Sequence, residues 1–217
     1  MKIIIYGVGK MAEFIWYCFT NDTAHEVVGF CYDEQYTEDR TTLFGLPVMP
    51  FQRAIERFSV ADHVFHVAIG QNTGRYRAFG LVRDAGFGFA SYLSTKANYW
   101  PDLVMGENVF IDQACIIQPF VTIGDNSMLI GARIGHHSSI GNHVLLSGTV
   151  LAGNVTIEDY SFLGINSGIK EGVTIAEANI ISSGTFINKN TKPNSLIYID
   201  RSLLKTAISK RITLFNR

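Results

Sequence analysis

The pattern of hydrophobic positions divides the chain into two halves. In residues 1–93, short apolar runs at 3–6, 27–32, 64–70 and 87–93 alternate with stretches whose apolar residues recur at helical spacing, after residue 9 and after residue 71. Strands that alternate with helices favour parallel pairing through right-handed crossovers. The first half is therefore predicted to form an α/β, Rossmann-like mononucleotide-binding domain over residues 1–94.

From about residue 100, a large aliphatic residue recurs with a period of six. Ile or Leu lies at 111, 117, 123, 129, 134, 140, 146, 151, 157, 163, 169, 175, 181 and 187, with intervals of five only after 129 and after 146. The positions two residues before these hold small or β-branched residues, except at Asn179. We call these two sets of positions the large and the small register. Side chains two residues apart on a short strand point to the same side, so both registers are expected to point inward. The pattern therefore predicts a solenoid over residues 95–192 in which three six-residue repeats, or hexads, close one coil.

The repeat is predicted to end after Ile187. Beyond it, Leu204, Ile208, Ile212 and Phe215 recur at helical spacing with basic residues between them. This pattern predicts an amphipathic helix in a C-terminal segment, residues 193–217, that caps the open end of the solenoid.

Composition excludes several classes of function. The 217 residues carry a net charge of -1, so there is no basic surface for nucleic acid or an anionic membrane. Cys18, Cys31 and Cys115 have no close spacing, which argues against a disulfide framework and a zinc knuckle. The first apolar run is too short for a signal peptide, and no stretch is long and apolar enough to cross a membrane. We expect a cytoplasmic protein.

A glycine-rich turn follows the first predicted strand. Gly7 and Gly9 precede a predicted helix, and Asp33 ends the second strand. Glycines allow the backbone to approach a phosphate at a helix N-terminus, while an acid about 20 residues on can accept from a ribose or base. The alternative is a tight turn that binds nothing.

A similar turn follows the third strand, in the segment IGQNTGRYR at 69–77. Asn72 and Arg75 are candidates for binding a diphosphate, because the forked guanidinium matches phosphate oxygens. The alternative is a solvated helix start. The expected position beside the first glycine turn favours binding.

Three histidines lie within the solenoid. His136 and His137 fall in a bend between faces, where a narrow core has no room for adjacent imidazoles, so they are predicted to project outward. An imidazole that titrates near neutrality suits proton removal from an amine or hydroxyl. The alternatives are solvated turn histidines or, less favoured, a metal site that includes His143, for which no acidic ligand is at hand.

Taken together, the two halves resemble the hexapeptide-repeat nucleotide-sugar N-acetyltransferases, which form left-handed parallel β-helices. The resemblance covers about residues 2–192 and is strongest in VAIGQNTGR (67–75), the His136 hexad, LAGNVTI (151–157) and FLGINS (162–167). Members act in the bacillosamine, perosamine and 4-amino-4,6-dideoxyglucose pathways, and sialic-acid O-acetyltransferases are relatives. The resemblance implies acetyl-CoA as co-substrate, no metal, and a homotrimer with active sites between subunits.

The resemblance also implies roles for individual residues. His136 is implied as the general base for the sugar 4-amino group, with His137 beside it, and the Gly153 N–H as the donor to the thioester oxyanion. Ile165 and Ser183 fall where backbone groups contact the pantetheine arm. The nucleotide diphosphate would be held by residues of the first half, namely Gly7, Gly9, Asp33, Asn72 and Arg75.

Three departures bear on the acceptor. His137 stands where an acid usually orients the base, a second family histidine has no counterpart about nine residues on, and the family's Asn before the base has no clear match in LIGARIG. The favoured function is acetyl transfer to the 4-amino group of a TDP- or UDP-linked 4-amino-4,6-dideoxy sugar. O-acetyl transfer, a non-catalytic sugar-nucleotide-binding protein and a zinc-dependent hydratase are the alternatives.

Overall fold

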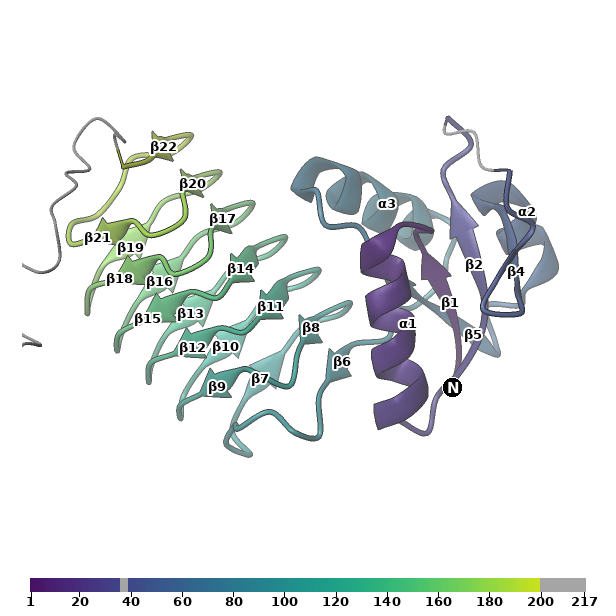
Figure 1. Ribbon diagram of the computed structural model, residues 1–217, viewed down its shortest axis with the longest axis horizontal. Helices are drawn as coiled ribbons and strands as arrows, with labels where there is room; N and C mark the ends of the chain where they lie inside the picture. The colour runs from purple at the N-terminus through teal and green to yellow at the C-terminus, as the bar shows by residue number, and fades with distance from the viewer. Residues whose placement is uncertain (36–38, 200–217) are drawn as a thin grey trace, which may run out of the picture.

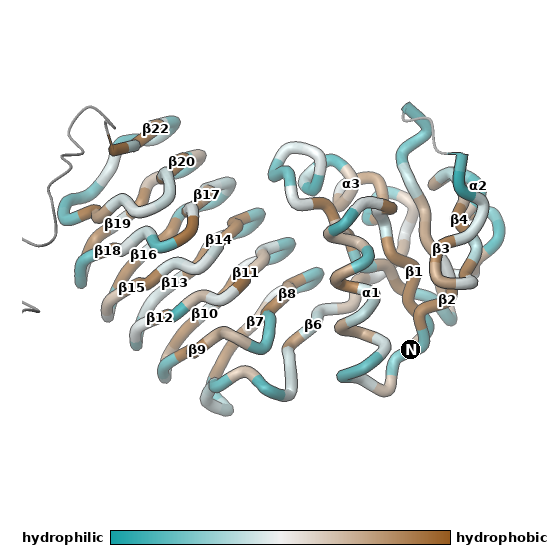
Figure 2. Tube along the Cα trace, viewed as in Figure 1, coloured by the Kyte–Doolittle hydropathy of each residue, from teal (hydrophilic) through white to brown (hydrophobic). Residues whose placement is uncertain are grey.

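The computed structural model describes residues 1–35 and 39–199. A small unit of sheet and helices at the N-terminus adjoins an elongated left-handed parallel β-helix, whose coils stack away from it toward β22 (Leu196–Ile197) (Figure 1). The strands of both parts are mostly hydrophobic, while many of the turns are hydrophilic (Figure 2). The predicted cap helix at 204–215 lies outside the described residues.

The described residues of the N-terminal unit form five strands and three helices. These are β1 (Lys2–Tyr6), α1 (Lys10–Asp22), β2 (Glu26–Tyr32), β3 (Thr42–Leu43), β4 (Leu46–Pro50), α2 (Phe51–Arg57), β5 (His63–Val67) and α3 (Asn72–Asp84). The sheet order is β3-β4-β2-β1-β5, and every pair is parallel except β3 with β4. The apolar runs of β1 and β2 form neighbouring strands inside this sheet, and that of β5 forms its edge; most of their residues are buried.

The prediction of a Rossmann-like N-terminal domain is wrong. Helices α1 and α3 form where helices were predicted, and α2, which was not predicted, joins β4 to β5. However, β2 reaches β4 through the short strand β3 rather than through a helix. The predicted fourth strand at 87–93 does not extend the sheet: Phe89 makes one isolated bridge to Phe65, and Tyr92–Leu93 forms the first strand of the β-helix, β6. The chain is thus a β-helix preceded by a short α/β part.

The β-helix has three flat faces. The first face comprises β6 (Tyr92–Leu93), β8 (Phe110–Ile111), β11 (Met128–Ile130), β14 (Leu145–Ser147), β17 (Phe162–Leu163), β20 (Ile180–Ile181) and β22 (Leu196–Ile197). The second face comprises β9 (Ile116–Ile117), β12 (Arg133–Ile134), β15 (Val150–Leu151), β18 (Gly168–Ile169) and β21 (Phe186–Ile187). The third comprises β7 (Val104–Met105), β10 (Thr122–Ile123), β13 (Ser139–Ile140), β16 (Thr156–Ile157) and β19 (Thr174–Ile175).

The two predicted registers form the core of the β-helix. The large residues from Ile111 to Ile187 are all buried in one cluster, and the small register, including Asn179, is buried as well. Both five-residue intervals fall at the turn from the first to the second face, where Gly131 and Gly148 adopt positive φ angles of 63° and 55° and close a shorter bend. β22 continues the first face one strand beyond the predicted end of the repeat.

Hydrogen bonds and apolar packing join the N-terminal unit to the β-helix. α1 packs its buried residues Ile15 and Phe19 in one cluster with Phe110, Met128 and Leu145, which point outward from the first face. The outward positions nearest the N-terminal unit are therefore covered. Farther along the same face, Ile180 and Leu196 are exposed.

Candidate functional site

A cleft of about 410 Å³ lies where β1 and β5 end and α1 and α3 begin. Gly7, Gly9 and Asp33 line it together, as predicted for residues at the carboxyl edge of parallel strands. Gly7 has a φ of 137°, and a Cβ there would lie 2.8 Å from the Ala68 carbonyl oxygen. Only glycine fits this turn, which keeps the backbone close to the space that a ligand would occupy.

Arg77 supplies the cleft with a cation that the sequence analysis did not single out. Its guanidinium pairs with the Asp33 carboxylate and donates to Gln35 Oε1 at 3.1 Å. The Tyr6 hydroxyl also donates to Asp33, at 3.5 Å, and burial raises the pKa of Tyr6. Arg77 lies two residues after Arg75 on α3, so the helix turns it toward the cleft while Arg75 faces the β-helix.

Arg75 does not line the cleft. The residue is fully buried, and its guanidinium donates to the carbonyl oxygens of Gly70 at 3.1 Å, Asn126 at 3.0 Å and His143 at 3.1 Å. It also donates to Asn72 Oδ1 at 3.0 Å. Burial lowers the pKa of Arg75 to about 10, so the side chain stays charged at neutral pH. Its position makes it part of the joint between the N-terminal unit and the β-helix.

Asn72 lies at the edge of a second, more apolar hollow of about 760 Å³. This groove runs between the start of α3 and the first face of the β-helix, and its other walls include Tyr76, Tyr160 and Phe162. The Asn72 amide donates to the Tyr160 carbonyl oxygen at 3.2 Å. The groove and the cleft share Gly70 and Gln71 and are therefore contiguous.

His136 and His137 occupy the turn from the second to the third face, and both are exposed, as predicted. Their Nδ1 atoms lie 3.1 Å apart, within hydrogen-bond distance. The His136 backbone N–H donates to Gln118 Oε1 at 2.9 Å. His137 has a φ of 59°, and the Phe120 ring packs against its imidazole with centroids 4.6 Å apart.

Gly153 lies one coil farther along the same turn, directly beneath the His136 imidazole. A Cβ on Gly153 would lie 2.5 Å from His136 Cε1 and 2.8 Å from Nε2, closer than any real contact. Within the described ranges, the Gly153 N–H donates to no acceptor, whereas the N–H of the next residue, Asn154, donates to the His136 carbonyl oxygen at 2.7 Å. An imidazole and a free backbone donor therefore lie side by side.

Ile165 and Ser183 lie at a different turn, from the first to the second face. Both are exposed and lie in successive coils. The two coils are in close contact here: a Cβ on Gly164, the residue before Ile165, would lie 2.8 Å from the Ser183 nitrogen. The second face separates this turn from His136 and Gly153. Within one chain the predicted cofactor-binding residues therefore occupy both edges of one face.

His143 does not join the other two histidines. It is buried at the turn from the third to the first face, stacks on Tyr160 with centroids 5.0 Å apart, and its Nδ1 lies 2.7 Å from Asn126 Nδ2. Burial, assisted by the nearby Arg75 charge, lowers the pKa of His143 to about 4. A neutral imidazole here accepts the hydrogen bond from Asn126 and belongs to the joint.

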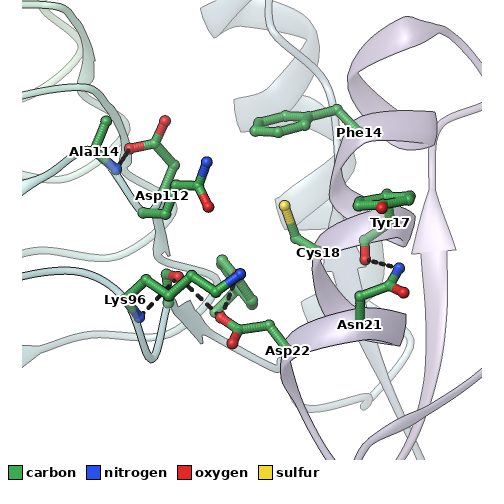
Figure 3. Close-up of a pocket in the computed structure, with 11 residues that line it drawn as sticks. Phe14, Tyr17, Cys18, Asn21, Asp22, Lys96, Asp112 and Ala114 are labelled. Atoms are coloured by element: carbon green, nitrogen blue, oxygen red, sulfur yellow. Dashed lines mark hydrogen bonds between the residues drawn. The ribbon is translucent and has the colours of Figure 1, made fainter.

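A third hollow, between α1 and the first coil, contains none of the predicted site residues (Figure 3). At its edge the Asp22 carboxylate accepts hydrogen bonds from the Thr95 hydroxyl, the Tyr92 hydroxyl at 2.7 Å and the Ser94 hydroxyl at 2.9 Å. These hydrogen bonds, that of Thr95 foremost, hold the pKa of Asp22 well below its usual range. Asp22 thereby attaches the end of α1 to the β-helix.

Residues 1–35 and 39–199 contain neither a metal-binding cluster nor a membrane-spanning helix. No group of three His, Cys, Asp or Glu side chains in these ranges is arranged to hold a metal ion. No helix there has the length and hydrophobicity needed to span a bilayer.

Comparison with known proteins places the fold among the hexapeptide-repeat acyltransferases. The family model described as the GMPPB C-terminal domain matches residues 90–197. A 2,3,4,5-tetrahydropyridine-2,6-dicarboxylate N-succinyltransferase from Bartonella bacilliformis is 36% identical over 124 residues, which cover 49% of this chain and 42% of that protein. The chain spans about half the length of the curated relatives it matches.

Two solved structures cover most of both chains. PerB from Caulobacter crescentus, in complex with CoA and GDP-perosamine, superposes with a TM-score of 0.78 at 24% identity, over 90% of this chain and 93% of PerB. WeeI from Acinetobacter baumannii gives a TM-score of 0.79 at 20% identity, over 90% and 96%. The resemblance to amino-sugar acetyltransferases predicted from the sequence is thus confirmed at the level of fold.

Proposed function

We propose that the protein is an acetyl-CoA-dependent N-acetyltransferase whose acceptor is the 4-amino group of a nucleotide-linked 4-amino-4,6-dideoxy sugar. The observation that carries the proposal is the His136 imidazole lying over Gly153, whose N–H is free within the described ranges. A base next to an oxyanion donor is the pair that acyl transfer to an amine requires. The perosamine N-acetyltransferase of Caulobacter crescentus, solved in complex with CoA and GDP-perosamine, supports a CoA thioester and a nucleotide-linked amino sugar as the substrates.

The reaction follows from this pair. The amine nitrogen attacks the thioester carbonyl carbon, its proton passes to His136 Nε2, and the Gly153 N–H donates to the oxyanion that forms. Collapse of the tetrahedral intermediate breaks the C–S bond, and the proton on His136 passes to the thiolate. The products are the N-acetylated sugar and CoA.

Positioning of the nucleotide is assigned to the cleft at β1. Gly7 and Gly9 bring backbone close to the diphosphate, and Asp33 accepts from the ribose or base. Asn72 sits in the adjoining groove, where it would contact the sugar end of the ligand. Arg75 has its donors engaged by carbonyls and by Asn72, so we assign it an indirect role, in which it holds the start of α3 against the β-helix.

The arrangement favours a homotrimer with active sites between subunits. The second face carries exposed apolar side chains in alternate coils: Ile116 at 43%, Val150 at 44% and Phe186 at 66% exposure. Arg133 and Gly168 occupy the coils between them. Its edges hold the His136 turn and the Ile165 turn. A second subunit packed on this face would cover the apolar row and bring a wall to the acetyl-CoA channel. We place the protein in the cytoplasm, where acetyl-CoA is made.

The test is CoA thiol release from acetyl-CoA with TDP-, UDP- and GDP-linked 4-amino-4,6-dideoxy sugars, each beside its 4-hydroxy counterpart. We expect release with one amino sugar at a kcat/KM of about 10⁴ M⁻¹s⁻¹ or more, and at least 100-fold less with its hydroxyl partner. Preference for a hydroxyl sugar would replace N- by O-acetyl transfer. Silence with every acceptor would overturn the proposal.

A further inference from the structure

We propose that His137 is the positioning residue for His136: a neutral imidazole that accepts a hydrogen bond from His136 Nδ1 in the role that a carboxylate plays in other acid–base dyads. This inference rests on the proposed function, in which His136 is the base. The observation behind it is the hydrogen bond between the Nδ1 atoms of His136 and His137, which lie 3.1 Å apart.

A contact between two Nδ1 atoms requires one ring to donate and the other to accept, because two unprotonated nitrogens would repel. If His136 donates, its Nε2 is left unprotonated, and this is the atom that lies beside Gly153. If His137 donates, His136 Nε2 carries the proton and cannot act as a base. The proposed reaction therefore fixes the direction of the hydrogen bond: His136 donates and His137 accepts.

The backbone positions His137 for this role. The turn from the second to the third face places residues of successive coils in the left-handed region, with Phe120 at φ 63°, His137 at 59° and Asn154 at 56°. Phe120 is a bulky residue in a conformation that such residues avoid, and it is 62% exposed. Its ring lies against the His137 imidazole and restricts the rotation of that ring.

The dyad also explains how the base is stabilised after proton transfer. When His136 takes the amine proton at Nε2, its ring becomes an imidazolium whose Nδ1–H still donates to His137. A charge-assisted hydrogen bond is stronger than a neutral one, so His137 favours the protonated intermediate over the ground state. The proton later leaves from Nε2 to the thiolate, and His137 ends unchanged.

Three substitutions at one position isolate the acceptor, because all of them tolerate a positive φ and all remove the contact with Phe120. His137→Gly removes the acceptor, whereas His137→Asp and His137→Asn restore an oxygen acceptor. We expect kcat to fall about 10- to 100-fold in His137→Gly, the range typical when the partner that orients a metal-ligating histidine is replaced. His137→Asp should recover kcat to within a few fold, and KM for both substrates should change little in all three.

A second readout does not depend on activity. Long-range ¹H–¹⁵N spectra of the imidazoles, recorded at a pH where the spectra themselves report neutral rings, should show His136 protonated at Nδ1 in the wild type and a mixture of tautomers in His137→Gly. Unchanged kcat in His137→Gly, or a wild-type His136 protonated at Nε2, would overturn the dyad. A wild type that acetylates no acceptor would overturn the proposed function instead, and the spectra would still decide the hydrogen bond.

Discussion

Replacement of Gly153 by Ala probes the juxtaposition of base and oxyanion donor. The new Cβ would lie 2.5, 2.8 and 3.1 Å from Cε1, Nε2 and Nδ1 of His136, whereas ordinary contacts begin near 3.4 Å. The imidazole must therefore move by about 1 Å. A misplacement of this size costs about 100-fold in rate, and the same movement would weaken the hydrogen bond to His137.

The assay compares kcat for acetyl transfer with the melting temperature of the same preparation. Because His136 is exposed, its ring can swing into solvent, and we expect the melting temperature to change by no more than about 3 °C. Gly80→Ala is the matched control: Gly80 lies on α3, a Cβ there meets nothing within 4 Å, and Ala favours the helix. Wild-type kcat in Gly153→Ala would show that acetyl transfer does not occur at this turn.

Two further predictions concern the joint between the two parts. Arg75→Met keeps the side-chain volume but leaves the buried carbonyls of Asn126 and His143 without their donor. We expect the free energy of unfolding to fall by about 3 kcal/mol or more. A decrease below about 1 kcal/mol in denaturant titrations would contradict this role of Arg75. For Asp22, hydrogen bonds lower the native pKa below the unfolded value, so the ionised carboxylate stabilises the fold above about pH 4 and this stabilisation is lost as the pH falls further. The melting temperature of Asp22→Asn should therefore lie below that of the wild type at neutral pH and approach it in acid. If the difference between the two melting temperatures stayed the same from neutral pH down to about pH 3, the role of Asp22 would be refuted.

Periodicity alone predicted most of the β-helix. A hexad constrains every second side chain on short strands, so the inward registers, the outward direction of His136 and His137, and the number of strands per coil all follow from spacing. The five-residue intervals were visible as well. That both intervals fall at one particular turn, where Gly131 and Gly148 adopt positive φ angles, became clear only once the coils were stacked.

The N-terminal half was harder to predict because its strands are set by tertiary contacts. The run at 87–93 has the composition of a strand, but it makes only one isolated bridge to the N-terminal sheet, at Phe89, and its end at Tyr92–Leu93 pairs with β8 of the β-helix. β3 and β4 have no alternating pattern, so both escaped prediction. Local signals of this kind leave the choice of partner open.

The candidate site shows the same limit. Gly7, Gly9 and Asp33 were placed together correctly because strand ends share one edge of a sheet. Arg75 was expected to face a ligand, yet it is the buried link to the β-helix, while Arg77 lines the cleft. The two residues differ only in which face of α3 they occupy, and that depends on how the helix packs against the β-helix, which the sequence pattern does not specify.

The most direct test of the central claim is single-turnover acetyl transfer by the wild type and by His136→Ala, with nucleotide-sugar binding measured on the same samples by calorimetry. Loss of a general base predicts a rate lower by about 10²- to 10⁴-fold, with the dissociation constant of the nucleotide sugar unchanged within about twofold, because His136 lies outside the cleft at β1. Equal transfer rates in the two proteins would remove His136, and with it this turn of the β-helix, from the mechanism.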